Sequence, residues 1–591
     1  MNLLLIHPPV SKPCEPPAGI ARLAGALREH GISCTVIDAN IEGLHFLLNS
    51  QRVREDAAIC GHDPISSKIE IAPPNLTEVL KARGRDRAGN TWTKRAVRNL
   101  PCHLLSLRTW PLYGHADRYR RAVADINRVL AGASSQESVT VSLADYEDAA
   151  LSPLRSADLR QAAAQPERNP FYHYFRVRIM SLLEEQNHEI IGISINYLSQ
   201  ALCAFALIGV IRSMLPHRKI ILGGGLVTSW LRQPQWRRTC GANRAVGTTE
   251  LGVDVLSSQS GGNNPFTGLV DDLVAGPGEE FLICLASKES RKISSGDDSK
   301  DLSYSDLATP SERSMLTVPC PDYRSFPWKL YISPGAIIPY SASTGCYWRR
   351  CKFCPETAER NPYRPLPVKK ILTDLARLKD ELKPVLIHFL DNAISPVLLT
   401  ALAEQRNRVP WYGFVRITEE MADPAFCRRL HDAGCVMLKL GLESGDQKVL
   451  DVLEKGISLQ MASRVLRNLK EAGIGTYVYL LFGTPAEDRS AACLTREYVV
   501  ANSPWIDFLN VAIFNMPVFA AVDLVTRPFS TGDLSLYTDF EHPQGWNRRE
   551  VRRFIAEEVK KHPAIAAILN RVPRIFTSNH APLNLIGGQT Y

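Results

Sequence analysis

The regular alternation of apolar, strand-like runs with amphipathic, helix-like stretches is the feature of this sequence that most constrains its fold. Alternation of this kind is typical of parallel sheets covered by helices. From residue 336 it predicts six strand–helix units, enough for a partial parallel barrel, with strands at 337–343, 385–390, 411–417, 436–442, 476–482 and 506–514. In such a barrel the chemistry sits at the C-terminal ends of the strands.

A shorter alternation precedes the barrel and predicts a doubly wound, Rossmann-like sheet. Its strands are expected at 3–6, 34–37, 189–195, 219–222 and 269–274. The predicted fold class is therefore α/β: a Rossmann-like domain, a partial (β/α)6 barrel and a helical C-terminal segment. The domain boundaries that we expect are 1–285 for the first domain (with a basic inserted subdomain at about 45–185), 286–335 for a linker, 336–520 for the barrel and 521–591 for a helical cap.

The 14 cysteines are too sparse in 591 residues for a disulfide scaffold. The first residues, MNLLLIHPP, lack the basic start and the long apolar run of a signal peptide. No apolar stretch reaches the length of a membrane span. We therefore expect a cytoplasmic protein with reduced thiols, in which most cysteines are small buried hydrophobic residues.

The net charge of +8 comes from one segment. Residues 78–130 hold twelve Lys and Arg against four Asp and Glu, a surplus of 12 − 4 = +8. This segment also contains Trp92, Trp110, Tyr113 and Tyr119. A mixture of basic and aromatic residues can hold nucleic acid. It can also cover an anionic small molecule or a lipid head group, or form an ordinary solvated helical face.

Three cysteines stand apart because they cluster. Cys346, Cys351 and Cys354 form the pattern C-x4-C-x2-C on a loop after the first predicted barrel strand. Cysteine ligands select zinc, copper(I) or iron–sulfur clusters. A structural zinc site would use four ligands, and the nearest other cysteine, Cys320, lies across a predicted strand. Three ligands leave one coordination position open, which suits a cluster that also binds a substrate or cosubstrate.

With these residues the second half of the chain resembles the radical S-adenosylmethionine (radical SAM) superfamily. The aromatic Phe353 before the third cysteine fits, and so do the downstream segments 440–445 (LGLESG) and 481–485 (LFGTP). The commonest spacing in the family is C-x3-C-x2-C, so this chain has one extra residue in the first gap. The resemblance implies that the three cysteines hold a [4Fe–4S] cluster, that SAM chelates the fourth iron, and that SAM is cleaved to a 5′-deoxyadenosyl radical.

The resemblance also suggests which residues bind SAM: Phe353, Asp391, Arg416 and Glu443. Glu443 corresponds to an acidic residue that binds the ribose hydroxyls, and is otherwise a solvated carboxylate at the barrel rim. Arg416 could pair with the SAM carboxylate or with a carboxylate of the rim. Asp391 stands where the family binds the SAM amine region, or it caps a helix.

The first half resembles the cobalamin-binding domain that precedes the barrel in one large radical SAM group. The matching segments are 5–9, 17–20, 36–38, 191–194, 222–224 and 275–279. The cofactor contacts that the resemblance implies are Ser194, Asn196, Gly223, Gly224, Gly276 and Glu279. The D-x-H-x-x-G pattern that supplies a lower histidine ligand elsewhere is missing, and His7 and His30 stand in other contexts. Any cobalamin is therefore expected base-off, without a histidine ligand from the protein.

Three functions remain open from the sequence. The first is cobalamin-dependent methylation of an unactivated carbon. The second is a radical cyclisation or rearrangement without methyl transfer, and the third is nucleic-acid binding with a structural metal. The expected partners are a small-molecule or peptide substrate and an external electron donor such as flavodoxin or ferredoxin, and nucleic acid is less favoured. No catalytic residue is assigned, and His580 is either a substrate contact or a packed histidine.

Overall fold

The computed structural model describes residues 2–49, 91–134, 138–185, 188–233, 254–257, 264–286, 318–405, 409–520, 524–528, 532–572 and 581–587. The chain divides into two compact units. The first consists of residues 1–108, 121–332 and 531–535, and the second of residues 109–120, 333–530 and 536–591. None of the described helices is long and apolar enough to cross a membrane.

The first unit is built on a six-stranded sheet with the order β2-β1-β5-β6-β8-β7. The strands are β1 (Asn2–His7), β2 (Ser33–Asp38), β5 (Ile190–Ser194), β6 (Lys219–Gly223), β7 (Asp254–Ser257) and β8 (Asp272–Ala275). All neighbours are parallel except β7, which runs antiparallel to β8. Beyond the expected strands the sheet therefore gains β7. The strand order reverses between β1 and β5, the place where doubly wound sheets bind their ligands.

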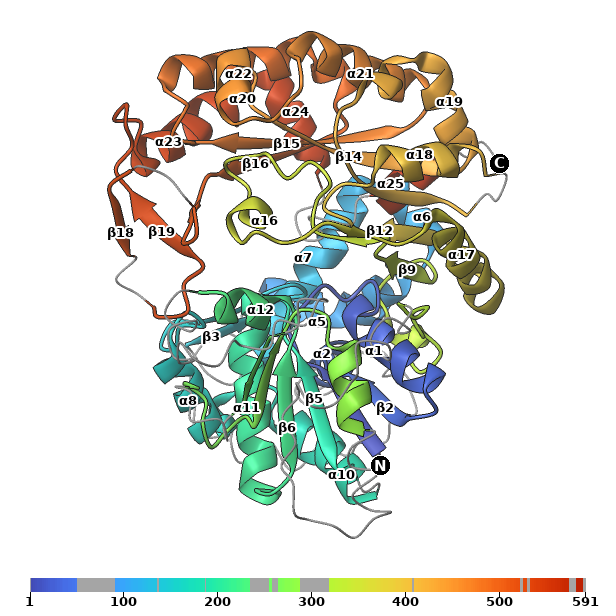
Figure 1. Ribbon diagram of the computed structural model, residues 1–591, viewed down its shortest axis with the longest axis vertical. Helices are drawn as coiled ribbons and strands as arrows, with labels where there is room; N and C mark the ends of the chain where they lie inside the picture. Colours follow the sequence, from blue (N-terminus) through green and yellow to red (C-terminus); the bar gives the residue numbers. More distant parts are fainter. Residues whose placement is uncertain are drawn as a thin grey trace. The chain divides into compact units, whose positions relative to one another are not determined.

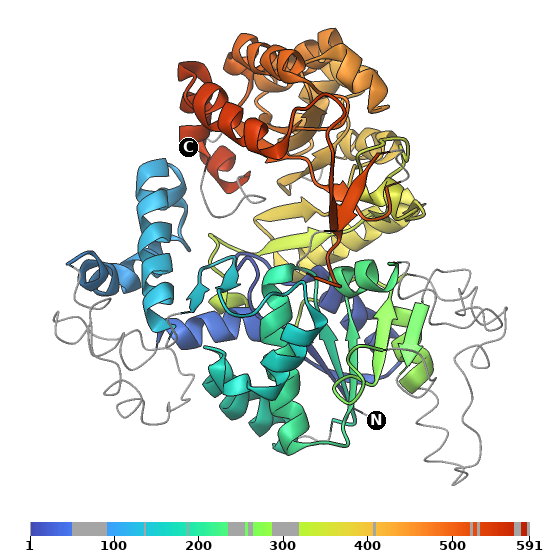
Figure 2. The ribbon, with the colours of Figure 1, turned by 90° about the vertical axis from the view of Figure 1, so that its left-hand side faces the viewer.

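Helices lie on both faces of this sheet (Figures 1 and 2). They include α1 (Ala18–Glu29), α2 (Ala39–Leu48), α8 (Ser156–Ala164), α10 (Met180–Glu185), α11 (Leu198–Met214) and α12 (Gly225–Leu231). Helix α11 is apolar all round, because it is buried along most of its length. Gly209 lets α11 approach α8 closely, since a Cβ there would lie 2.0 Å from the carbonyl oxygen of Ala163.

The segment expected as a basic insertion is folded where it is described. It contains α5 (Thr91–Ser106), α6 (Trp110–Tyr113), α7 (Ala116–Ala133) and the hairpin of β3 (Val139–Val141) and β4 (Tyr146–Asp148). Tyr113 and Tyr119 are buried and pack against each other, whereas Trp92 is exposed. Two of the four interleaved aromatic residues are therefore core residues, and a third, Trp110, packs against a core cluster. The basic residues at 81–87 lie outside the described residues.

The described end of the expected linker is packed onto the first unit. The Asp322 carboxylate pairs with Arg28 of α1 and with Arg324. The Tyr331 hydroxyl donates to Asp38 Oδ2 at 2.6 Å. Residues up to 332 therefore belong to the first unit, and residues 287–317 of that linker lie outside the described residues.

The second unit contains the expected parallel sheet, with the strands in sequential order from β9 to β16. The strands are β9 (Ile337–Tyr340), β12 (Leu386–Phe389), β13 (Trp411–Val415), β14 (Cys435–Glu443), β15 (Gly475–Phe482) and β16 (Phe508–Ile513). Every neighbouring pair is parallel. Among the described strands β9 and β16 are the two edges, so the sheet is an open, partial (β/α)6 barrel, and the predicted fold class is confirmed.

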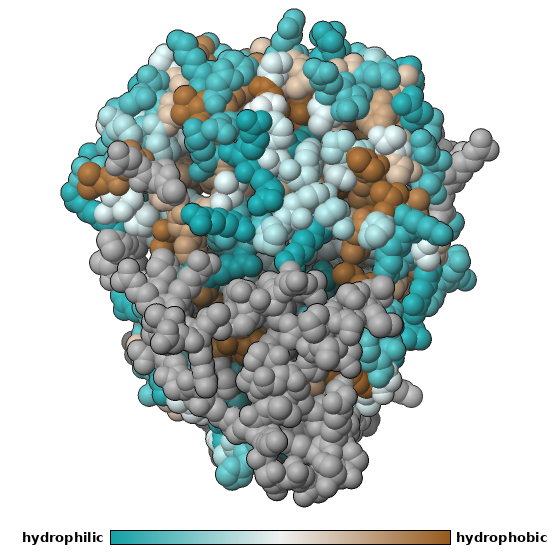
Figure 3. Space-filling view, in the orientation of Figure 1, coloured by the Kyte–Doolittle hydropathy of each residue, from teal (hydrophilic) through white to brown (hydrophobic). Residues whose placement is uncertain are grey.

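Helices cover one face of the barrel sheet (Figure 1). They are α17 (Val368–Leu382), α18 (Pro396–Ala403), α19 (Pro424–Asp432), α20 (Gln447–Val452), α21 (Leu459–Glu471) and α22 (Arg489–Ala501). Five of them start at a residue whose side chain accepts backbone N–H groups: Ser395, Asp423, Asp446, Ser458 and Asp488. These caps explain why the helices begin where they do. The described surface over α20–α22 is largely hydrophilic in Figure 3.

The other face of the sheet is closed near the N-terminal ends of the strands by an apolar cluster. Its strand members are Ile337, Leu386, Tyr412, Met437, Tyr477 and Phe508, and Ala581 and Leu585 of α25 (Ala581–Gly587) complete it. Trp110 of α6 also packs against it. The C-terminal ends of the strands are therefore the ends left for chemistry.

The segment expected as a helical cap also contains strands. Strands β18 (Thr526–Pro528) and β19 (Tyr537–Phe540) lie in it, and they form a small antiparallel sheet with β17 (Met516–Pro517) from the end of the expected barrel. Helices α23 (Arg548–Phe554), α24 (Pro563–Arg571) and α25 follow, and α23 continues into a π-helical segment, Ile555–Val559. These strands are too short to show an alternating pattern in the sequence. His580 lies outside the described residues.

Candidate active site

The three clustered cysteines lie on the loop between β10 (Ser343–Thr344) and α16 (Pro355–Ala358), beyond the C-terminal end of β9. Cys351 is buried, and Cys346 and Cys354 are partly buried. The Cys346 thiol lies close enough to Cys351 to raise its pKa, and Cys351 raises the pKa of Cys354 in the same way. As the side chains stand, no three His, Cys, Asp or Glu residues of the described chain are gathered closely enough to share a metal ion. The loop thus carries three thiol donors of the kind that an iron–sulfur cluster uses.

The protonation of these thiols follows from burial. Burial raises the pKa of Cys354 to about 11, although backbone N–H groups of Glu356 and Thr357 act in the opposite direction. Burial also raises the pKa of Cys351, against the charges of Lys455 and Arg416. A metal centre needs thiolates, so its binding here must release protons.

Arg416 is a side chain that contacts the cysteine loop at Cys351. It follows β13, is buried, and places Nη1 at 3.7 Å from the sulfur of Cys351. Its Nη2 donates to the Lys455 carbonyl oxygen, and its guanidinium stacks on Trp348 at 4.0 Å from the ring centre. The structure therefore brings Arg416 to the cysteine loop, and among the described residues it forms no ion pair with a carboxylate.

Glu443 ends β14 and forms an ion pair with Lys455, with 2.7 Å between Oε1 and Nζ. Both side chains are largely buried, with exposed fractions of 13% and 8%. The Glu443 backbone has a φ of +68°, at an irregularity in the pairing of β14 with β15. Gly441 makes room for the pair, because a Cβ there would lie 2.5 Å from Glu443 Oε1 and 2.8 Å from Lys455 Nζ. Glu443 is thus not a solvated rim carboxylate.

Phe353 completes this group of residues. The Lys455 ammonium lies 5.4 Å from the centre of its ring, and the ring packs on a small core of Val449, Leu453 and Ala491. Lys455 and Trp348 were not assigned by the sequence analysis. Lys455 lies three residues after α20 and directly before a glycine. This Lys-Gly pair fits the resemblance to the radical SAM superfamily and is the signal that could have identified it.

Asp391 lies at the same end of the sheet, but its carboxylate is bound by residues of the neighbouring chain segment. Its carboxylate accepts from the backbone N–H of Ala342 at 3.0 Å and from the Ser343 hydroxyl at 2.5 Å. Burial raises the pKa of Asp391. Asp391 therefore ties the end of β12 to the segment leading to the cysteines. The helix-capping role considered for it belongs to Ser395.

A buried cation in the barrel interior was also missed by the sequence analysis. Lys439, in the middle of β14, is 1% exposed. Its Nζ lies 3.3 Å from His388 Nε2 and 4.9 Å from the ring centres of Tyr412 and Phe414. The signal in the sequence is a single lysine inside the apolar run CVMLKLGLE.

In the first unit, Ser194 and Asn196 lie at the C-terminal end of β5, at the switch point of the sheet. Asn196 Nδ2 donates to Ser194 Oγ at 3.3 Å, and its Oδ1 accepts from Gly225 N at 2.9 Å. Ser194 pairs in register with Gly223 of β6. Gly224 has a φ of +105°, and a Cβ there would lie 2.4 Å from the Ile195 carbonyl oxygen. These four predicted residues are thus brought together.

The other two predicted residues of this unit follow β8. Gly276, with a φ of +86°, donates its N–H to the Thr228 hydroxyl at 3.0 Å. Glu279 forms an ion pair with Arg22 of α1 at 2.7 Å. His7 is buried with Nε2 at 2.9 Å from Ser11 Oγ, and burial lowers its pKa to about 3. His30 contacts the Ala26 carbonyl oxygen in its own helix. Both histidines thus have local structural partners.

Residues 340–493 match the model of the radical SAM superfamily. The chain is 24% identical over 307 residues to an anaerobic magnesium-protoporphyrin IX monomethyl ester cyclase of Cereibacter sphaeroides, over 48% of this chain and 49% of that protein. It is 22% identical over 247 residues to an uncharacterized methyltransferase of Pyrococcus horikoshii, over 40% of this chain and 50% of that protein. The chain thus spans about half the length of the curated relatives it matches.

Among solved structures, the chain is similar to the radical S-adenosylmethionine methyltransferase TsrM of Kitasatospora setae, which was solved with cobalamin and a [4Fe–4S] cluster bound. The sequence identity is 16% and the TM-score is 0.45, over 87% of this chain and 75% of that one.

Proposed function

We propose that this chain, which belongs to the radical SAM superfamily through residues 340–493, is a cobalamin-dependent enzyme that methylates an unactivated carbon. The observation that carries the proposal is the cysteine loop at the C-terminal end of the barrel, with Arg416 against Cys351 and the buried Glu443–Lys455 pair beside it. Cys346, Cys351 and Cys354 would hold a [4Fe–4S] cluster. With SAM bound to it, that cluster supplies a 5′-deoxyadenosyl radical, which removes hydrogen from the substrate.

The residues around the cysteines have separate tasks in this proposal. Arg416 and Lys455 favour the thiolate of Cys351, and Trp348 covers the guanidinium of Arg416. Glu443 carries the carboxylate for the ribose hydroxyls of SAM, and Lys455 holds that carboxylate in place. Asp391 keeps the start of the cysteine loop attached to β12.

In the first unit we propose that cobalamin binds at the C-terminal ends of β5, β6 and β8. Ser194 and Asn196 offer polar groups there, Gly223 ends β6, and Gly224 and Gly276 belong to the turns that follow β6 and β8. Glu279, bound to Arg22, would shape this edge of the sheet. His7 and His30 have local partners, which agrees with base-off cobalamin that lacks a histidine ligand from the protein.

The experiment is anaerobic reconstitution with iron, sulfide and cobalamin, followed by incubation with SAM, a reductant and candidate substrates. Methylation predicts that 5′-deoxyadenosine and S-adenosylhomocysteine form together and that the product gains the mass of a methylene group. Formation of 5′-deoxyadenosine and a modified substrate without S-adenosylhomocysteine would contradict methylation.

A cyclisation or rearrangement is the second candidate, and the similarity to the anaerobic cyclase favours it. It retains the cysteine loop and the SAM site but predicts a product that has lost hydrogen or kept its mass. In either case we propose a small-molecule or peptide substrate and an external electron donor. The burial of Tyr113 and Tyr119 removes two aromatic residues from any stacking surface for nucleic acid.

A further inference from the structure

A pocket opens at the same edge of the barrel sheet as the cysteine loop. It is lined by Gly483 after β15, by residues 513–516 at the end of β16, by residues 538–540 of β19 and by the segment leading into α23. Its cavity volume is about 30 Å³, so it can take in a small charged group but not a whole ring system. Because reacting groups sit at the C-terminal ends of barrel strands, this pocket lies where a substrate can be anchored.

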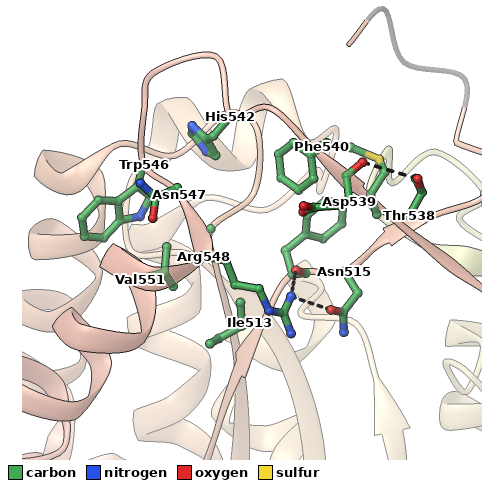
Figure 4. Close-up of a pocket in the computed structure, with 13 residues that line it drawn as sticks. Ile513, Asn515, Thr538, Asp539, Phe540, His542, Trp546, Asn547, Arg548 and Val551 are labelled. Atoms are coloured by element: carbon green, nitrogen blue, oxygen red, sulfur yellow. Dashed lines mark hydrogen bonds between the residues drawn. The ribbon is translucent and has the colours of Figure 1, made fainter. Parts of the chain in front are cut away.

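Arg548 supplies the positive charge of the pocket. One nitrogen, Nη1, donates to the Phe514 carbonyl oxygen at 3.2 Å and to Asn515 Oδ1 at 2.7 Å. Figure 4 shows the guanidinium turned toward Asn515 by these two bonds. Within the described residues the other guanidinium nitrogens have no hydrogen bond. A guanidinium fixed at one nitrogen presents its remaining N–H groups to a carboxylate.

Asp539 supplies a negative charge on the other wall. It attracts Arg548 electrostatically, yet among the described residues it forms no ion pair with Arg548 or with any other cation. Two opposite charges therefore line one small pocket without neutralising each other by contact. This arrangement matches a ligand that carries both charges, with its carboxylate toward Arg548 and its ammonium toward Asp539.

The remaining walls are aromatic. Phe540 lies edge-on to Phe514, with 5.8 Å between ring centres, and Trp546 is buried behind the pocket. Trp546 is held by a hydrogen bond from Nε1 to Glu487 Oε2 at 3.2 Å. Figure 4 shows Trp546 and His542 on one side of the pocket and Phe540 and Asp539 on the other. Aromatic walls favour an apolar group next to the charged one.

We propose that this pocket binds the zwitterionic head group of an α-amino acid, so that the substrate of the enzyme is a free amino acid or carries a free amino-acid group. The proposal rests on the proposed function only in treating this ligand as the substrate. The binding itself depends on Arg548, Asn515 and Asp539.

The test is ligand-observed NMR with the full-length chain and three probes. L-Phenylalanine carries both charges, L-phenylalaninamide lacks the carboxylate, and 3-phenylpropionate lacks the ammonium. We expect L-phenylalanine to bind tightest. The variant R548Q should bind it roughly tenfold or more weakly, because a charge-assisted contact is lost, and D539N should reduce the advantage of L-phenylalanine over 3-phenylpropionate.

The matched control is R549Q, which changes the neighbouring exposed arginine that does not line the pocket. It should bind like the wild type, and the unfolding temperature of each variant shows that the fold is retained. Equal binding of L-phenylalanine to wild type and R548Q, or no binding to wild type, would overturn the proposal. Equal binding of the three probes would overturn it as well.

A separate variant distinguishes this proposal from the proposed function. The triple substitution C346A/C351A/C354A removes the cluster ligands but leaves the pocket, so it should bind L-phenylalanine like the wild type. If probe binding persists while no 5′-deoxyadenosine forms in the reconstituted wild type, the pocket stands and the proposed function fails. If 5′-deoxyadenosine forms but no probe binds, the pocket proposal fails alone.

Discussion

At the scale of single residues, the site depends on charged side chains that are buried. Glu443 has a left-handed backbone and a buried ammonium partner, and Arg416 is buried between a thiol and an indole ring. Backbone strain of this kind persists only where the surroundings impose it, and it is often found at functional sites. Here the surroundings are the β14–β15 irregularity, Gly441 and Lys455.

The strain at Glu443 can be separated from its carboxylate by two substitutions. E443A and E443G both remove the carboxylate and leave Lys455 without this ion-pair partner. Only glycine, however, adopts a φ of +68° without a cost in free energy. We expect E443G to be more stable than E443A by about 1 kcal/mol, as measured by denaturant unfolding. Both should lose SAM affinity in equilibrium binding. Equal stability of the two variants would show that the left-handed backbone carries no strain.

Glu487 predicts a pH dependence of stability. It is fully buried near the wall of the pocket, and burial raises its pKa to about 7, with the charges of Asp488 and Asp446 adding to the effect. Its Oε1 has no hydrogen-bond partner within the described residues. The folded state thus favours the protonated carboxyl. Its contribution to stability is present below the ordinary pKa of a glutamate and is lost as the pH rises through about 7.

The variant E487Q tests this effect, because its amide is neutral at every pH. Between about pH 5 and pH 7.5 the wild type should lose up to about 3 kcal/mol of unfolding free energy relative to E487Q. Denaturant unfolding at a series of pH values measures the difference. Parallel stability profiles for the two proteins would rule out a titrating Glu487 in this range.

The residues that the sequence made visible are those whose chemistry shows in local spacing. The three cysteines could be singled out because they lie within nine residues, and Arg416 and Glu443 because they end predicted strands. Lys455 and Trp348 could not be assigned, because they meet Glu443 and Arg416 only through long-range packing. Lys439 was not singled out either, although it is a charge inside an apolar strand, because its partner His388 lies on a different strand.

At the scale of elements, the turn between β6 and α12 is the most constrained part of the proposed cobalamin site. Gly224 has a positive φ and no space for a Cβ, whereas Gly225 has neither constraint and a Cβ there would lie 3.5 Å from Asn196 Oδ1. The backbone N–H of Gly225 is bound by Asn196. The turn thus needs glycine at one of two adjacent positions.

Alanine substitutions of Gly224 and Gly225 separate the strain in this turn from the general effect of adding a methyl group. G224A should destabilise the protein by roughly 2 kcal/mol and weaken cobalamin binding, because the turn must shift away from the Ile195 carbonyl. G225A is the control and should stay close to the wild type in both. Thermal unfolding and absorbance titration with cobalamin measure the two quantities. If G224A behaves like G225A, the turn does not need the left-handed conformation.

The sequence predicted most strands and helices of both sheets, because long apolar runs and helix caps are local signals. It did not predict β7, which has four described residues and an antiparallel partner, or the small sheet of β17 to β19. Short strands of this kind are specified by their neighbours in space rather than by their own pattern. The pocket beside Arg548 was missed for the same reason, because its walls come from separate elements.

At the scale of the whole molecule, the proposed cofactor sites belong to different compact units. The cysteine loop and the SAM residues belong to the second unit, and Ser194, Asn196 and the glycines belong to the first. Each unit has its own sheet and its own buried core. We therefore expect each unit to bind its cofactor independently of the other.

The triple variant C346A/C351A/C354A is expected to bind cobalamin with the affinity of the wild type while it binds no iron–sulfur cluster. In reverse, protein prepared without cobalamin should still assemble the cluster. Cobalamin absorbance after gel filtration and iron analysis measure the two contents. Loss of cobalamin from the triple variant would show that the sites depend on each other.

The most direct test of the account is spectroscopy of the anaerobically reconstituted protein together with its product analysis. The account predicts the visible absorbance of a [4Fe–4S] cluster, an electron paramagnetic resonance signal that changes on addition of SAM, and formation of 5′-deoxyadenosine. All three should vanish in C346A/C351A/C354A. They should persist in the control C102A/C284A/C493A, which removes three other cysteines that are not fully buried. Zinc in place of iron, or 5′-deoxyadenosine formation that survives loss of the three clustered cysteines, would contradict the account.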